Sequence, residues 1–444
     1  MALINQLNQD LVIVDKTVPS EYNLFEKQSY NFSELASDYI VHSTMAQIGE
    51  GPFDIIVPPN DKLHWDLPRS LLLVAGRMVH ADGSLITEDN SVGAVNLLLH
   101  SLFSHIEMHI NGQLVTDPNN LYGYRSYLET LLSYNADVLR TRGKAELWQK
   151  DTAGKMEAFM DGEHENDGWN VRERIVQKST FICMMGQPHI DLFHQEKLIP
   201  PHMSMKFRFI RQKPEFYCLN HFGKRDVKYR FIITKAELHL KWRLPIPDLQ
   251  AGAERALQRY NYEINFTKVM MKTFNIAAGS TVQNVPNMYL DRLPDIITFG
   301  FVDDESFSGA FHRNPYNFLN MNLSHMLLRV NNAIYPGYPL SPSFKVGEEN
   351  YIREYMYWLQ ALGLEVGNKA IDVTPQEWAN GYTLFSFRIA HGPISPYTPR
   401  APPPQGTASL ELKFAVAPTK NVQLVLYAQY PCHIEINKDY EVVQ

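Results

Sequence analysis

The sequence contains few cysteines. Its 444 residues include three, Cys183, Cys218 and Cys432. An odd number of widely separated cysteines supports neither a disulfide framework nor a zinc knuckle, which needs closely spaced cysteine pairs. The simplest interpretation is a protein that folds in a reducing compartment.

Long apolar runs are also missing. Leu71–Gly76 and Ile296–Val302 have the length of a strand and are far shorter than the roughly 20 apolar residues of a membrane-spanning helix. The first residues do not form a basic region followed by an apolar core, so no signal peptide is predicted. Whether a membrane is among the partners stays open.

Basic charge is scarce. The net charge is −7, and residues 1–50 hold seven acidic residues and two lysines, a balance of 2 − 7 = −5. A protein that coats nucleic acid usually carries a basic patch or tail. The composition therefore argues against direct, sequence-specific nucleic-acid binding.

Two binding motifs are incomplete. Gly143-Lys144 has neither the preceding glycine nor the following Ser or Thr of a phosphate-binding loop. Residues 161–167 carry acids at the spacing of a calcium loop. However, Asn166 replaces the required glycine, and Arg172 replaces the glutamate that closes such a loop. We favour a solvated loop over a calcium site.

Histidine–carboxylate pairs leave an iron site as a rival. His189 and Asp191, with His239 further on, could form the two-His-one-carboxylate triad of iron oxygenases. His64 and Asp66 have the same spacing. Because the chain has 16 histidines, such pairs arise easily, and we favour surface or turn histidines. We expect no catalytic, cofactor-binding or metal-binding residues.

What the sequence does contain is a series of short strands between Pro, Gly and Asn turns. β-Branched and aromatic residues alternate with polar ones, which is typical of sandwich or barrel domains. The predicted strands of the first half are 55–57, 71–78, 105–110, 203–210 and 230–242. Those of the second half are 264–274, 296–302, 325–330, 383–389, 409–416, 422–427 and 433–436.

Four segments repeat in the same order in the two halves. Residues 104–111 match 324–331 at an offset of 324 − 104 = 220, with three identities. The other pairs are Leu67–Ala75 with Leu293–Phe301, Arg125–Leu131 with Arg353–Leu359, and Met205–Phe207 with Leu412–Phe414. The common order predicts a duplicated β domain.

In the pair Arg125–Leu131 and Arg353–Leu359 the apolar residues recur at helical spacing. Each half should therefore carry one amphipathic helix that closes the end of its barrel. His105 and His325 stand at matched places on strands. We favour structural hydrogen bonding for them over a shared metal.

Pro245 and Pro247 cannot lie in a central strand and predict a linker that continues as a short helix to about Tyr260. The charged segment Tyr134–Lys178 and the proline-rich segment His391–Gly406 are predicted to be long surface loops.

One stretch resembles a known family. It comprises Asn96–Ile106, Asn111-Gly112, Asp117-Pro118 and Tyr122–Tyr134, the last reading YGYRSYLETLLSY. The stretch is similar to the hexon-type major capsid protein of adintoviruses and Polinton (Maverick) elements. The general pattern covers the chain from about residue 30 to its end.

The resemblance implies an all-β fold of two tandem eight-stranded jelly-roll barrels, a double jelly roll, each with a short helix and long loops. The expected divisions are an N-terminal arm with its leading strand (1–50), a first jelly roll (51–245), a linker (246–262) and a second jelly roll (263–444).

The resemblance also implies a non-enzymatic virion protein without cofactors. Such a chain forms homotrimers that contact neighbouring capsomers and a penton or minor capsid protein, and that tile an icosahedral shell. The alternative is a non-viral two-domain β-sandwich protein that binds carbohydrate or protein ligands.

Overall fold

The computed structural model describes most of the chain. The described residues are 33–44, 47–87, 92–159, 165–220, 227–367, 369–390 and 404–443. The segment 1–30 of the arm and most of the proline-rich segment 391–406 lie outside these residues, so the expectations for them remain predictions.

The first barrel consists of two four-stranded antiparallel sheets. One sheet has the order β1 (Glu34–Ser43), β10 (Tyr229–Pro245), β3 (His64–His80) and β7 (Ile182–Gly186). The other has the order β2 (Phe53–Val57), β8 (Met205–Arg211), β5 (Phe103–Ile110) and β6 (Gln113–Leu114). A small separate sheet pairs β4 (Val92–Ala94) with β9 (Cys218–Asn220).

The second barrel repeats this strand order. Its first sheet runs β11 (Tyr262–Ile276), β18 (Val422–Ile436), β13 (Ile296–Asp303) and β16 (Phe385–Arg388), with β19 (Val442–Val443) beside β18. Its second sheet runs β12 (Val282–Arg292), β17 (Gln405–Phe414), β14 (Leu323–Val330) and β15 (Ala333–Leu340). Each barrel therefore has 4 + 4 = 8 strands in equivalent places, and the fold is the predicted double jelly roll.

Alternating burial explains why these segments form half-buried strands. Along β8, Met205, Phe207 and Phe209 are buried, whereas Lys206 and Arg208 between them are not. Successive strand residues point to opposite faces of a sheet, so one face of β8 enters the core. The cores of the two barrels merge into one continuous apolar cluster.

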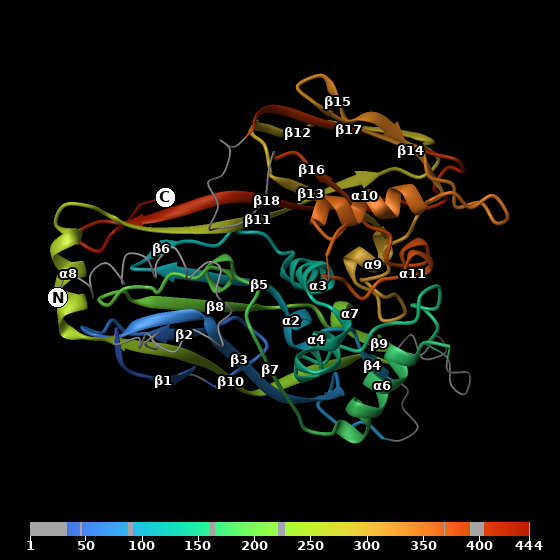
Figure 1. Ribbon diagram of the computed structural model, residues 1–444. Coiled ribbons are helices and arrows are strands. Elements are labelled where there is room, and N and C mark those ends of the chain that lie inside the picture. The colour runs from blue at the N-terminus through green and yellow to red at the C-terminus, as the bar shows by residue number, and fades with distance from the viewer. Residues whose placement is uncertain are drawn as a thin grey trace, which may run out of the picture.

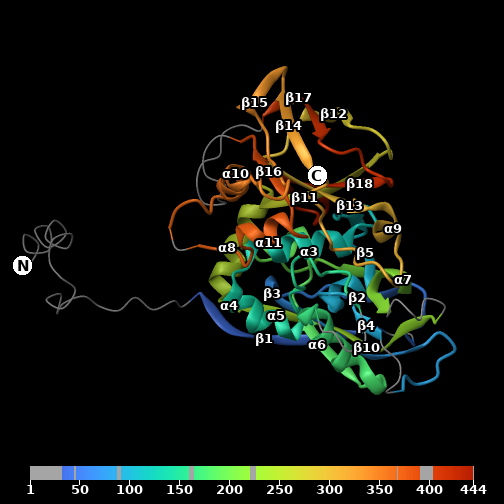
Figure 2. The same cartoon turned by 90° about the vertical axis from the view of Figure 1, so that its right-hand side faces the viewer.

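Helices and long loops gather at one end of the molecule. Helix α8 (Pro247–Leu257) connects the barrels at the end where β10 finishes and β11 begins, and the other large helices lie at the opposite end (Figure 1). Helix α3 (Tyr122–Ser133) lies between β3 and β11, as both views show (Figures 1 and 2). Helix α10 (Ile352–Leu362) follows β15 as α3 follows β6.

The remaining helices are short. They are α2 (Leu98–Ser101), α4 (Ala136–Arg140), α5 (Arg142–Ala145), α6 (Asp167–Val176), η2 (Gln177–Ser179), η3 (Asp191–His194), α7 (Pro214–Tyr217), α9 (Asp304–Ser308) and α11 (Pro375–Ala379).

The duplication extends to the hydrogen bonds of one hairpin. Both β5 and β14 shift register at a serine, Ser104 and Ser324, whose hydroxyl donates to a carbonyl of the neighbouring strand. Both hairpins turn through an asparagine in the left-handed region, Asn111 (φ 47°) and Asn331 (φ 50°). Asparagine tolerates this conformation better than most residues. The predicted equivalence of residues 105–110 and 325–330 is confirmed.

Two details of the predicted repeat were wrong. Phe207 lies opposite Met108, and Leu410 lies opposite Leu328, so the true offset between β8 and β17 is 410 − 207 = 203 rather than 207. The repeat aligned residues 71 and 73 of β3 with the buried residues 297 and 299 of β13. Residues 71 and 73 are only half-buried, whereas Leu72 and Val74 are fully buried. Short apolar alternations match equally well at several shifts, which explains both errors.

Other strand predictions need smaller corrections. The two strands predicted at 422–427 and 433–436 are one strand, β18, which pairs with β11 without interruption. Pro245 ends β10 opposite Glu34 rather than lying beyond it. Strands β1, β7, β12 and β15 were not predicted, nor were the short strands β4, β6, β9 and β19.

The predicted surface loop at Tyr134–Lys178 was also wrong. The described part of this segment holds α4, α5 and α6, and its large side chains enter the core. Trp148 and Trp169 are 2% and 1% exposed, and Arg172 is fully buried. The charges that suggested a solvated loop are partly paired inside the protein.

Candidate functional site

The junction between the barrels contains a group of stacked aromatic rings. Tyr127 of α3 stacks on Tyr316 of the second barrel with ring centroids 4.0 Å apart, and Tyr124 contacts Phe307 and Phe318. The Tyr316 hydroxyl donates to the Gly123 carbonyl at 3.1 Å. Buried aromatic pairs contribute about 0.5–1.5 kcal/mol beyond their buried area, so this contact holds α3 firmly against the second barrel.

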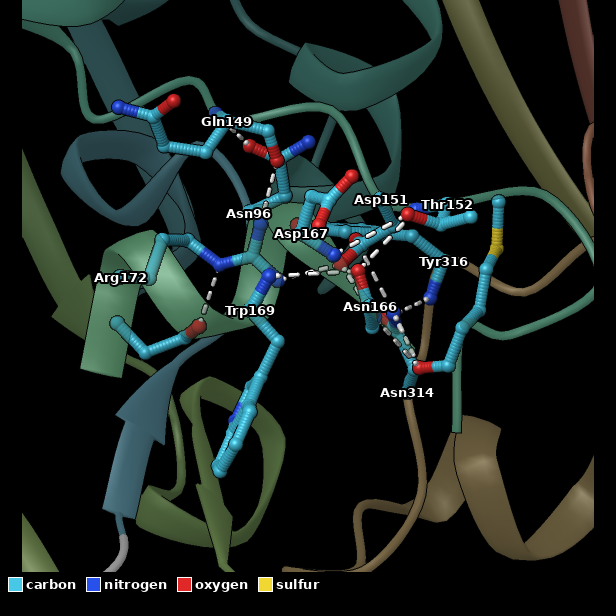
Figure 3. A network of polar contacts seen from close by, with 12 residues as sticks. Asn96, Gln149, Asp151, Thr152, Asn166, Asp167, Trp169, Arg172, Asn314 and Tyr316 are labelled. Atoms are coloured by element: carbon cyan, nitrogen blue, oxygen red, sulfur yellow. Dashed lines mark hydrogen bonds and ion pairs between the residues drawn. The ribbon is translucent and has the colours of Figure 1, made fainter. Parts of the chain in front are cut away.

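A buried ion pair lies beside the aromatic group. Arg172 Nη2 lies 2.6 Å from Asp151 Oδ1, with side-chain exposures of 0% and 1% (Figure 3). Asn166 Nδ2 donates to the same oxygen at 2.9 Å, and Asn314 of the second barrel donates to Asp151 Oδ2 at 3.2 Å. The carboxylate thus accepts from three donors, which come from both barrels.

Further polar contacts cross the junction at this end. The Tyr382 hydroxyl donates to the Asp151 carbonyl at 2.6 Å, and Lys150 Nζ lies 2.7 Å from a Glu377 carboxylate oxygen. Arg313 pairs with Glu157. These two ion pairs are partly exposed and contribute little to stability, whereas the buried contacts of Asp151 join the two barrels more strongly.

The junction continues toward the end with α8. Lys197 Nζ donates to the Glu263 carbonyl at 2.6 Å, and Asn111 Nδ2 donates to the Tyr440 carbonyl at 2.7 Å. The barrels are therefore connected along much of their length.

The residues of the rival iron triad do not come together. His189 and Asp191 are both 2% exposed, but Asp191 pairs with Arg125 at 2.6 Å and His189 contacts Glu129. His239 lies on β10 with its Nε2 3.3 Å from Glu237. Among the described residues, the histidine–carboxylate groups whose ligand atoms converge do not include His239.

Instead, a buried cluster surrounds Glu129 of α3. His189 Nδ1 lies 2.6 Å from Glu129 Oε2, and Arg125 Nε donates to Glu129 Oε1 at 2.9 Å. Burial alone would raise the pKa of Glu129, but Arg125 and His189 hold it well below its usual value. Burial lowers the pKa of His189 to about 4, so this imidazole is neutral at pH 7. The expectation of a surface or turn histidine holds in part, because His189 lies in the turn before η3 but is buried rather than on the surface.

Asp191 links this cluster to the second barrel. Its Oδ1 accepts from Arg125 Nη2 and from the backbone N–H of Val269 on β11 at 3.1 Å. Burial raises the pKa of Asp191, although Arg125 opposes the shift. The cluster is therefore part of the junction as well as of the first barrel.

The candidate histidines His64 and His105 lie apart from this cluster. Asp66 accepts from Arg69 and Arg243 rather than acting with His64. His105 is 6% exposed, and its Nε2 makes no hydrogen bond among the described residues. Burial lowers the pKa of His105.

The calcium-loop candidate is described only in part, because residues 161–164 lie outside the described residues. Asn166 caps α6 by accepting from the Trp169 N–H at 3.3 Å. Asn166 and Arg172 are both fully buried. The expectation of a solvated loop was wrong for these two residues, and sequence analysis missed the roles of Asp151, Glu129 and Asn314.

No helix within the described residues is long and apolar enough to span a membrane.

Comparisons with known proteins agree with this architecture. No protein-family model matches the chain. An uncharacterized protein of Caenorhabditis elegans, F54H12.2, is 21% identical over 366 residues, which cover 79% of this chain and 83% of that protein.

Solved structures match nearly the whole chain. The Sputnik virophage structure gives a TM-score of 0.64 at 10% identity, covering 96% of this chain and 92% of the other. The PBCV-1 capsid gives 0.57 at 11% identity, covering 95% and 100%. The mavirus major capsid protein gives 0.54 at 12% identity, covering 96% and 94%. The chain thus has the fold of the double jelly-roll major capsid proteins of virophages and giant viruses.

Proposed function

We propose that this chain is a major capsid protein that self-assembles into an icosahedral virus shell. The observation that carries the proposal is the fusion of two barrels with the same strand order through a buried junction. A rigid pair of equivalent barrels can act as one third of a pseudo-hexagonal unit. The whole-chain similarity to viral major capsid proteins supports the same role.

The assembly that we propose is a homotrimer. Three chains place 3 × 2 = 6 barrels in a ring, and such a ring closes through head-to-tail contacts between different faces of neighbouring chains. The exposed apolar side chains support this assembly, because capsomer contacts would cover them. Those on β1 are Leu35, Tyr39 and Val41, and those on α10 are Ile352 and Met356.

Finer assignments belong to the same proposal. We infer that the chain is of the hexon type of adintoviruses and Polinton elements, since the stretch that resembles that type builds α2, β5, β6 and α3. We also infer the divisions 1–50, 51–245, 246–262 and 263–444. The partners would be neighbouring capsomers and a penton or minor capsid protein within the virion.

The acidic N-terminal arm suggests assembly through protein contacts rather than genome phosphates. Deletion of residues 1–30 should leave the trimer intact and weaken association between trimers. Loss of the trimer itself, or shells of normal stability, would contradict this role.

Size and shape test the proposal directly. The purified chain of 51.1 kDa should elute as a species of about 153 kDa (3 × 51.1) by light scattering and appear as pseudo-hexagonal particles in negative-stain microscopy. A monomer at micromolar concentration that binds a carbohydrate or protein ligand would instead support the two-domain β-sandwich alternative. Iron-dependent turnover of 2-oxoglutarate would indicate an oxygenase.

A further inference from the structure

We propose that His100, Glu146 and His189 form a zinc site inside the first barrel. The three residues are 0%, 4% and 2% exposed, and each offers a ligand atom within 4.8 Å of the other two. They come from three separate segments: α2, the residue after α5, and the turn before η3.

One nitrogen of each histidine makes a good hydrogen bond, and the other can bind a metal. Within the described part of the chain, His189 Nε2 contacts only the Thr130 hydroxyl at 3.5 Å, which is too long for a good hydrogen bond. His189 uses Nδ1 for Glu129 at 2.6 Å, and His100 uses Nδ1 for the Tyr122 hydroxyl at 3.0 Å. Zinc-binding imidazoles commonly donate their second N–H to such an oxygen, which fixes the tautomer and ring orientation. The Tyr122 oxygen also accepts from the His189 backbone N–H at 3.1 Å, and its two lone pairs allow both bonds.

The remaining nitrogen of His100, Nε2, supports the zinc site independently of the convergence of the three side chains. Nε2 of this fully buried side chain makes no hydrogen bond among the described residues. The carboxylate oxygen Oε2 of Glu146 lies 3.5 Å away, too far for a good hydrogen bond. Tetrahedral zinc with bonds of 2.0–2.1 Å places its ligand atoms about 3.3 Å apart, which is close to this separation.

The charge of the cluster favours a divalent cation. The carboxylates of Glu129, Glu146 and Asp191 and the guanidinium of Arg125 give a formal charge of −3 + 1 = −2, not counting the histidines. An uncompensated buried charge of this size is costly. One Zn²⁺ neutralises it, and two imidazoles with one carboxylate are a common zinc ligand set that leaves a fourth position for water.

A second group in the same cluster fits a metal less well. Glu129, His189 and His194 also converge, but Arg125 already occupies Glu129 Oε1 at 2.9 Å. The fixed guanidinium charge would repel a metal ion bound to that carboxylate. His194 is also more exposed than the other histidines, with a side-chain exposure of 34%. Because the two groups share His189, a substitution of His189 cannot tell them apart. Substitutions of His100 and His194, each of which belongs to one group, can.

Metal content tests the proposal. The full-length chain is expressed in minimal medium with added Zn²⁺ and, separately, with added Co²⁺, so that metal enters during folding. Zinc is measured by inductively coupled plasma mass spectrometry, and cobalt by the visible absorption of the tetrahedral ion. We expect one metal per chain and a tetrahedral cobalt spectrum.

Matched variants locate the site. His100→Gln and Glu146→Gln should lose the stoichiometric metal while keeping the wild-type circular dichroism and oligomer size. His194→Gln should retain it. Metal-free wild-type protein from both media would overturn the proposal, as would metal retention by a folded His100→Gln variant. Should the ligand variants fail to fold, the wild-type stoichiometry, the cobalt spectrum and the His194→Gln variant still decide the question.

Discussion

Replacing Arg172 by methionine tests whether the buried polar network holds the two barrels together. Methionine keeps an apolar stem of similar length but leaves the Asp151 carboxylate with only the amide donors of Asn166 and Asn314. Removing one partner of a buried ion pair costs about 3–5 kcal/mol. We expect the free energy of unfolding to fall by this amount.

The change in Tm depends on how much of the chain unfolds together with the junction. At about 2.1 cal/mol/K per residue, the unfolding entropy of 444 residues is about 0.93 kcal/mol/K. The Tm should then fall by roughly 3–5 °C in a single transition. If the barrels unfolded separately, each transition would carry about half of this entropy, and one transition would shift by about twice as much.

Differential scanning calorimetry of matched variants provides the assay. Arg174, two residues further along α6, is exposed, so Arg174→Met should leave Tm unchanged. The double variant with Asp151→Asn removes both charges and should recover the part of the loss that comes from the unpaired carboxylate. The part that comes from the lost bonds of Arg172 to the Ala94 and Gln149 carbonyls should remain. A Tm of Arg172→Met within about 1 °C of the wild type would refute the reasoning.

Three other substitutions test single contacts by urea denaturation. Gly123→Ala places a methyl group 3.0 Å from Phe216 Cε1 and 3.2 Å from the Tyr316 hydroxyl, and this overpacking should cost about 1–3 kcal/mol. Asn331→Ala removes the bonds to the backbone of residues 405 and 407 at a left-handed position and should also cost about 1–3 kcal/mol. Trp378→Ala, at a fully buried side chain, should cost about 3–5 kcal/mol. Wild-type stability of any variant would contradict the role of that contact.

The strands and the duplication could be predicted because both depend on local alternation. Residues 106, 108 and 110 and their counterparts 326, 328 and 330 are apolar and lie on one face of their strands, and this apolar face recurs in both barrels. Exact register could not be predicted, because it depends on cross-strand partners far away in the sequence.

The segment around α6 was misread because its charges are internally satisfied. Asp151 and Arg172 look solvated in the sequence, yet their pairing inside the protein depends on residue 314 of the other barrel. The nearby Trp148 and Trp169 were the available signal, since large aromatic side chains seldom lie in a solvated loop.

The histidine cluster could not be assembled from sequence spacing. His100, Glu146 and His189 lie 46 and 43 residues apart (146 − 100 and 189 − 146), and the fold alone brings them together. The short spacing of His189 and Asp191 suggested a shared metal, but the two side chains have different partners. The histidine contacts Glu129, and the aspartate accepts from Arg125.

Equivalent helices in the two barrels have unequal surroundings. The offset that aligns the arginines at 125 and 353 aligns Tyr124 with Ile352 and Leu128 with Met356. Tyr124 and Leu128 are 2% and 1% exposed, whereas Ile352 and Met356 are 55% and 45% exposed. The second barrel covers Tyr124 through aromatic contacts with Phe307. No described part of the chain covers the equivalent face of α10.

A closed ring of six barrels would cover that face with the first barrel of the next chain. Full burial of a methionine or isoleucine side chain contributes about 1.5–3 kcal/mol. Met356→Glu should therefore weaken each contact between chains by roughly 10- to 100-fold while the monomer stays folded. Light scattering over a dilution series measures this change, and Tyr260→Glu, at an exposed aromatic next to α8, serves as the control. A Met356→Glu trimer as stable as the wild type would refute the ring geometry inferred from the two helices.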